Sequence, residues 1–131
     1  MAGIFQQTTN SIKELLGAAS EGADPEGVRI AYGALRDQWR AAAREARKTQ
    51  AGSIERFESH ASLMGGEAYW PAIDALTNGR DATVELKMAR EAAGWIARAS
   101  QAFAQHDQAM VDRCFELAGM VVGTTRPDSE S

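Results

Sequence analysis

The sequence has little of the residue types on which several kinds of chemistry depend. Its 131 residues include one cysteine, Cys114, and two histidines, His60 and His106. A single cysteine excludes an intramolecular disulfide, which fits a reducing compartment. One cysteine and two distant histidines do not form a zinc-binding pattern. We therefore expect no metal site, and we expect Cys114 to behave as a small hydrophobic residue on the apolar face of a helix.

Nucleotide-binding glycine loops and long apolar runs are also missing. Neither GxGxxG nor GxxxxGK[ST] occurs in the sequence, so we expect no nucleotide cofactor and no enzymatic activity. No segment approaches the about 20 apolar residues that span a bilayer. The N-terminus lacks the basic segment and apolar run of a signal peptide. These absences predict a cytoplasmic protein that does not contact membranes.

The composition is that of an ordinary globular domain. Hydrophobic residues make up 44% and charged residues 24% of the chain, and the net charge is −4. Sustained alternation of apolar and polar residues, which is typical of strands, does not occur. The sequence therefore predicts an all-α fold, a compact bundle of four to six helices. We expect residues 1–123 to form a single helical domain and residues 124–131 a disordered tail.

Capping residues and glycines set the expected helix limits in the first half of the chain. A first helix is expected over 9–19, with Thr9, Asn10 or Ser11 as its cap. Asp24 and Pro25 predict the start of a second helix, which runs to about Lys48. Ser53 predicts the start of a third helix, which the glycine pair at 65–66 ends. A short fourth helix is expected from Glu67 or Pro71 to Thr77, followed by Asn78-Gly79.

The C-terminal part of the chain carries one long apolar stripe. Its positions follow steps of four, four and three residues, an eleven-residue period: Val84, Met88, Ala92, Trp95, Ala99, Phe103, His106, Met110, Cys114, Leu117 and Val121. This pattern permits one helix over 81–122. The polar stretch 105–108 favours instead a helical hairpin, with Asp107 as the cap of its second helix. So long a stripe also predicts self-association, as a homodimer.

The stretch from His60 to Gly65 resembles the phosphorylation site of histidine phosphotransfer domains. These all-helical signalling proteins carry the accepting histidine on a bundle helix, followed by a lysine and, one turn along, a glycine. Here Leu63 stands at the lysine position and Met64 at the glycine position. The resemblance implies that His60 accepts a phosphoryl group. The alternative is a polar residue in the last turn of the third helix, where a histidine interacts with the helix dipole, or a histidine that is simply exposed on the surface.

Basic residues form a ridge along the expected second helix, which we call the arginine ridge: Arg29, Arg36, Arg40, Arg44, Arg47 and Lys48. Residues 29–50 contain six cations and two anions, so they carry +4 while the rest of the chain carries −8. The ridge could pair with the acidic helices of the same chain. It could also bind an acidic protein partner, or the phosphates of a nucleic acid.

Two adjacent aromatic residues, Tyr69 and Trp70, follow the glycine pair. They either seat a loop on the core or form an exposed anchor for a partner. Together with the arginine ridge they are the candidate partner-binding residues. We therefore expect a non-catalytic interaction protein that acts on a macromolecule, such as an adaptor, an assembly factor or an inhibitor of the kind phages encode. The alternatives are a nucleic-acid-binding accessory protein that uses the ridge, and a phosphotransfer domain.

Overall fold

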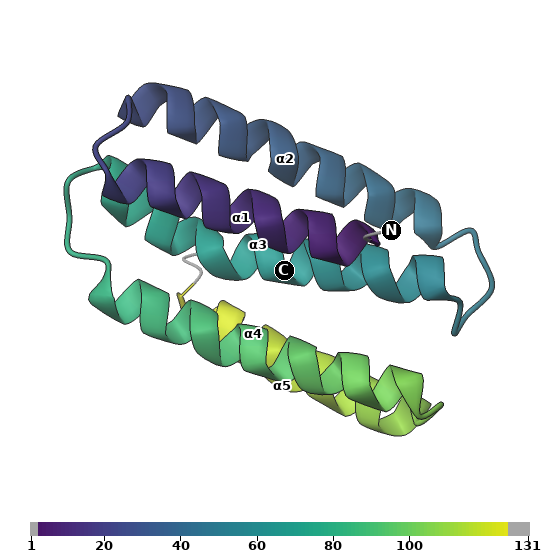
Figure 1. The fold of residues 1–131 in the computed structure, drawn as a ribbon. Helices are drawn as coiled ribbons and strands as arrows, with labels where there is room; N and C mark the ends of the chain where they lie inside the picture. Colours follow the sequence, from purple (N-terminus) through teal and green to yellow (C-terminus); the bar gives the residue numbers. More distant parts are fainter. Residues whose placement is uncertain (1–2, 126–131) are drawn as a thin grey trace.

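The computed structural model describes residues 3–125 and forms an all-α bundle (Figure 1). Over these residues it contains five helices, α1 (Ile4–Ser20), α2 (Pro25–Ala46), α3 (Ile54–Thr77), α4 (Thr83–Ala104) and α5 (Gln108–Thr125). The helix α3 lies in the middle. It packs against α1 and α2 on one side and against the hairpin of α4 and α5 on the other. The predicted all-α bundle is confirmed.

The capping residues predicted for α2 and α3 are confirmed. Asp24 Oδ2 accepts a hydrogen bond of 3.1 Å from the backbone N–H of Gly27, and Pro25 is the first helical residue. Ser53 Oγ accepts one of 3.2 Å from the N–H of Arg56. Each cap satisfies a backbone donor that has no partner within the first turn of the helix.

The helix α1 begins earlier than its sequence predicted. Its N-cap is Gly3, which supplies no side-chain hydrogen bond. The hydroxyl of Thr9, an expected cap, instead donates to the backbone carbonyl of Phe5 at 3.0 Å, inside the helix. One position earlier, Thr8 is buried and donates to Ser62 Oγ of α3 at 2.9 Å. Packing of this first part of α1 on α3 therefore overrides the local capping signal.

The helix α3 is continuous where two helices were expected. It passes through Gly65-Gly66 and through Pro71 and ends at Thr77, before Asn78-Gly79 as predicted. Both glycines of the pair are buried. The carbonyl of Gly66 accepts a hydrogen bond of 2.8 Å from the hydroxyl of Tyr32. Gly66 thus serves close packing between α2 and α3, neither glycine ends the helix, and the separate fourth helix does not exist.

The C-terminal part is a hairpin, as the polar stretch favoured. The turn contains His106 with a positive φ of 59°, and Asp107 Oδ1 accepts a hydrogen bond of 3.1 Å from the N–H of Met110. The hairpin folds the apolar stripe back on itself, so Cys114 is buried while Val84 stays 67% exposed. The helix α5 reaches Thr125, and the rest of the expected tail, 126–131, lies outside the described residues.

Two hydrophobic clusters form the core, and α3 contributes to both. The first joins α3 to the hairpin and includes Phe57, Ile96 and Val111. The second joins α3 to α1 and α2 and includes Ile12, Tyr32, Trp39 and Ile73. No helix over residues 3–125 is long and apolar enough for a membrane span.

Candidate partner-binding site

The first half of the arginine ridge is paired with acidic residues of α3. Arg29 Nη1 donates to Asp74 Oδ1 at 2.7 Å. Arg36 donates two hydrogen bonds to the carboxylate of Glu67, at 3.1 Å from Nε and 2.9 Å from Nη2. Arg40 reaches the same carboxylate at 3.2 Å. These three arginines stabilise the packing of α2 on α3, as one of the alternatives for the ridge proposed.

The aromatic pair lies within α3 and not in a loop. The guanidinium carbons of Arg29 and Arg36 lie 5.2 Å and 4.6 Å from the centre of the Trp70 ring, so both cations cover it. Trp70 also lies 5.9 Å from the ring of Tyr32, measured between ring centres. Tyr69 is half-buried, and burial raises the pKa of its hydroxyl. The geometry thus gives Trp70 a role in the interface between α2 and α3.

The second half of the ridge is exposed. Among the residues that the structure describes, Arg44 and Arg47 form no ion pair. Lys48 contacts Glu45 at 3.4 Å, and both side chains are 75% exposed, so this pair contributes little. These residues lie where α2 ends, beside the connection to α3. The ridge therefore divides into a structural half and a half that remains available to a partner.

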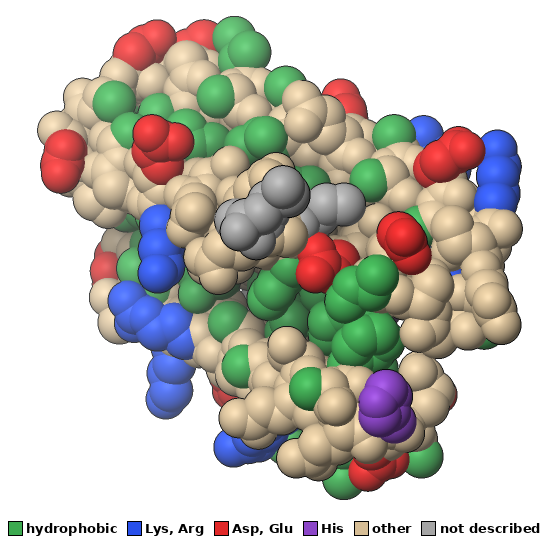
Figure 2. All heavy atoms as spheres, turned by 45° about the vertical axis from the view of Figure 1, so that its right-hand side comes forward, with side chains coloured by type: hydrophobic (Ala, Val, Ile, Leu, Met, Phe, Trp, Pro, Cys, Tyr) green, Lys and Arg blue, Asp and Glu red, His purple; other side chains and the backbone are tan. Residues whose placement is uncertain are grey.

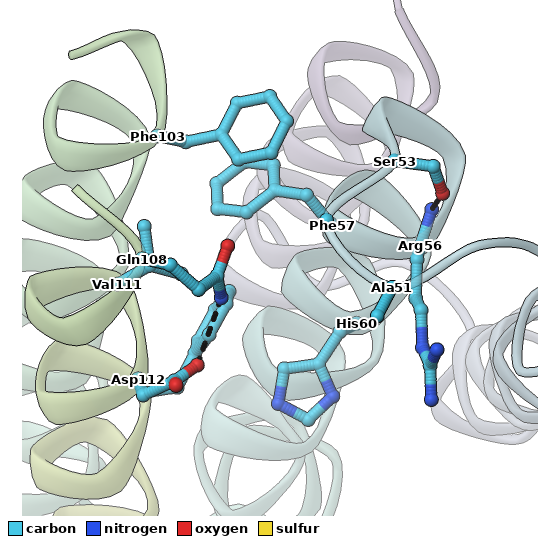
Figure 3. A pocket seen from close by; sticks show the side chains of 11 residues that line it. Ala51, Ser53, Arg56, Phe57, His60, Phe103, Gln108, Val111 and Asp112 are labelled. Carbon is cyan, nitrogen blue, oxygen red and sulfur yellow. Dashed lines mark hydrogen bonds between the residues drawn. The ribbon is translucent and has the colours of Figure 1, made fainter. Parts of the chain in front are cut away.

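A pocket of about 660 Å³ opens next to this available half. It lies between the start of α3, the end of α4 and the start of α5 (Figure 3). Its lining residues are Ala51, Gly52, Ser53, Arg56, Phe57, His60, Phe103, Gln108, Val111, Asp112 and Phe115. Hydrophobic side chains gather in the hollow between the three N-terminal helices and the hairpin on the face drawn in Figure 2.

Aromatic rings form the apolar wall of the pocket. Phe57 and Phe103 are stacked, with ring centres 4.5 Å apart and planes inclined by 18°. Phe115 lies 5.5 Å from Phe57 in a tilted arrangement. In Figure 3 the rings of Phe57 and Phe103 face each other from α3 and α4. Such a wall offers a flat apolar surface on which a further apolar side chain can pack.

His60 and Arg56 belong to the polar part of the lining. The ring of His60 meets that of Phe115 edge to face, with centres 4.5 Å apart, and extends from α3 toward α5 (Figure 3). Partial burial and the nearby charge of Arg47 lower the pKa of His60, while Asp112 acts in the opposite direction. Arg56 Nη1 makes a long hydrogen bond of 3.4 Å to the carbonyl of Thr49. Arg56 and Arg47 bring positive charge to this side of the pocket, and the Asp112 carboxylate, which accepts a hydrogen bond from Gln108, brings one negative charge to its α5 side.

The position of His60 differs from the expectation. It lies in the second turn of α3, far from the C-terminal end, because α3 does not stop at the glycine pair. The predicted interaction of His60 with the C-terminal end of a helix is therefore wrong. Met64, one turn after His60, is partly buried, where a phosphotransfer domain has glycine. Within residues 3–125 there is no cluster of three or more acidic, histidine or cysteine side chains that could hold a metal ion.

Sequence reasoning missed the pocket itself. Three of the four phenylalanines of the chain line it. Phe103 was expected on an apolar helix face, but nothing in the sequence places Phe57 and Phe103 beside Phe115. Comparison of the chain with protein-family models, curated proteins and solved structures finds no match.

Proposed function

We propose that the protein is a non-catalytic binding protein that recognises an acidic segment of a protein partner. A large apolar side chain of that segment enters the aromatic pocket, and neighbouring carboxylates contact Arg47 and Arg56. The observation that carries the proposal is the position of the pocket. It opens beside arginines that form no ion pair in the described part of the chain.

The size and the chemistry of the pocket support this kind of ligand. A volume of about 660 Å³ accommodates a large side chain and its flanking backbone. Burial of an aromatic side chain removes about 150–250 Å² from water. At about 25 cal/mol per Å² this contributes about 4–6 kcal/mol before the entropic cost of association. Carboxylates beside the arginines then provide selectivity and faster association.

The division of the ridge disfavours nucleic acid as the ligand. Arg29, Arg36 and Arg40 are paired with Asp74 and Glu67. A phosphate backbone would have to displace these carboxylates, or bind through the three remaining cations alone. A surface that neutralises few phosphates binds nucleic acid weakly, and its affinity depends little on salt. A protein segment needs only the end of the ridge that lies beside the pocket.

A displayed peptide library tests the proposal, because it samples many combinations of apolar anchor and flanking charge. We expect selection on the wild-type protein to enrich peptides that combine a Phe, Trp or Leu anchor with neighbouring Asp or Glu. Fluorescence anisotropy then measures the affinity of an enriched peptide for the wild type and two variants. Arg47→Glu is expected to weaken binding about tenfold, which is about 1.4 kcal/mol. Lys87→Glu makes the same charge change at an exposed site on α4 and is expected to have a much smaller effect.

Several outcomes would contradict the proposal. Enrichment of basic peptides, or of none, argues against an acidic partner segment. Equal losses of affinity in Arg47→Glu and Lys87→Glu show that binding depends on overall charge and not on the pocket. A peptide that tolerates replacement of its anchor by Ala does not use the aromatic wall. The same anisotropy measurement is made with oligonucleotides. If they bind more tightly than the enriched peptides, the ligand is nucleic acid and not a protein segment.

A further inference from the structure

A second cavity, of about 100 Å³, lies between α1, α3 and α4, and its lining does not overlap that of the aromatic pocket. Gly65 and Tyr69 of α3 form part of its lining. Ile12 and Leu16 contribute from α1 and Ile96 from α4. These side chains make the cavity mainly apolar, and it lies in the middle of the bundle rather than at its end.

No neighbouring atom of the described residues requires glycine at position 65, and its missing side chain leaves part of this space open. A Cβ atom added there would lie 3.9 Å from Ile12 Cδ1, an ordinary van der Waals contact. Alanine would therefore fit, and in a helix interior it is more favourable than glycine. The neighbouring Gly66 is different, because an added Cβ would overlap the ring of Trp39. Only the first glycine of the pair can be replaced without a clash, and its replacement narrows the cavity.

The charged side chain that lines the cavity is positive, and the carboxylate of Glu58 lies nearby, where it accepts a hydrogen bond of 3.3 Å from the backbone N–H of Phe5. Lys13 is exposed, lines the cavity and forms no ion pair among the described residues. Arg90 is close enough to Tyr69 to lower the pKa of its hydroxyl, against the larger opposite effect of burial. Within the described part of the chain, no carboxylate lines the cavity. An apolar space with a cation at its edge fits an amphipathic anion better than a neutral or cationic ligand.

We propose that this cavity binds a small carboxylic acid with a short branched apolar body, of which isovalerate is the simplest probe. A cavity of 150 Å³ holds benzene, so about 100 Å³ holds roughly four carbon atoms. The branched body lies against Gly65 and Ile96, and the carboxylate lies at the Lys13 side. This site is independent of the function proposed for the aromatic pocket.

Titration of isotope-labelled protein with isovalerate, followed by two-dimensional NMR, tests the site. We expect saturable shifts at the amides of Ala93 and Ile96, with a dissociation constant on the order of 1 mM for so small a ligand. Isovaleramide has the same shape without the charge and should bind several-fold more weakly. Lys13→Gln should weaken isovalerate binding and leave isovaleramide binding unchanged.

Gly65→Ala is the decisive variant. It is expected to abolish the isovalerate shifts while the far-UV circular dichroism stays the same and the melting temperature equals or exceeds that of the wild type. Ala93→Val fills the cavity from α4 and provides a second test if Gly65→Ala does not fold. The proposal is wrong if wild type shows no saturable shift, if both filling variants bind as tightly as wild type, or if isovaleramide binds as tightly as isovalerate.

Discussion

Trp39 of α2 lies against the backbone of Gly66 in α3, so that a Cβ atom at position 66 would overlap Cε3 and Cζ3 of the indole ring. Tyr32 contacts Trp39 edge to face, with ring centres 5.6 Å apart, and donates a hydrogen bond to the carbonyl of Gly66. Two aromatic residues of α2 therefore converge on one glycine. This contact fixes how closely the two helices approach.

Gly66→Ala is expected to destabilise the protein. The added methyl group forces Trp39, which is 6% exposed, out of a packed site, and such overpacking costs about 1–3 kcal/mol. Gly65→Ala is the matched control, because the same change at the adjacent position meets no clash and gains helix propensity. Urea denaturation followed by circular dichroism measures both. Equal free energies of unfolding for the two variants would show that the indole moves aside at little cost.

Glu67→Gln is expected to destabilise the interface between α2 and α3. The carboxylate of Glu67 is 15% exposed and is shared by Arg36, which is 19% exposed, and by Arg40. Its neutralisation leaves a largely buried guanidinium without a counter-charge, which we expect to cost about 2 kcal/mol. Glu45→Gln removes the exposed partner of Lys48 and should change the free energy of unfolding by less than about 0.5 kcal/mol. If both variants lose the same free energy, the buried carboxylate has no special role.

The pH dependence of stability should contain a contribution from His60. Its pKa in the folded protein lies below the ordinary value of 6.5, chiefly because of partial burial and then because of Arg47. Between these two pKa values the unfolded chain binds more protons at this site than the folded chain. The contribution of His60 to stability is therefore complete above pH 6.5 and is lost as the pH falls from there toward the folded pKa.

His60→Gln isolates this contribution. The variant should lose less free energy of unfolding than the wild type when the pH is lowered through this window, as measured by urea denaturation at a series of pH values. His106→Gln is the control, because it changes the exposed histidine in the turn between α4 and α5. Parallel curves for wild type and His60→Gln would mean that the imidazole titrates normally in the folded protein.

Self-association remains a prediction, and the structure changes the surface on which it depends. The hairpin folds the apolar stripe, and Val84 and Met120 stay 67% and 62% exposed. They lie near the start of α4 and the end of α5, at the same end of the hairpin. We expect sedimentation analysis to show a dimer that Val84→Lys/Met120→Glu converts to a monomer. Ile54→Lys, at an exposed site on α3, should leave it intact; a wild type that sediments as a monomer refutes the prediction.

Local signals predicted the parts of the fold that depend on local structure. Asp24, Pro25 and Ser53 mark the starts of α2 and α3 because capping is a property of a few neighbouring residues. The hairpin turn at Asp107 was favoured for the same reason. Gly65-Gly66 resembles a helix end locally. Its actual role depends on Trp39, which comes much earlier in the chain and contacts it only in the folded protein.

The candidate site was predictable only in part. Helical spacing placed six cations on one ridge, but it could not identify the acids opposite them. Glu67 and Asp74 lie 31 and 45 residues away from Arg36 and Arg29. Which half of the ridge lies opposite acidic residues of α3 therefore depends on how the helices pack. The aromatic pocket is a long-range feature as well, since Phe57 and Phe115 belong to separate helices.

The central position of α3 has a consequence for how the protein can be divided. Phe57 and Ala61 of α3 are covered by the hairpin, whereas Ile73 is covered by α1 and α2. A cleavage or a premature stop that removes the hairpin would uncover Phe57 and Ala61. It would leave a helix with one side open to water and prone to aggregation or proteolysis. Within residues 3–125 we therefore expect the helices on the two sides of α3 to depend on each other for stability.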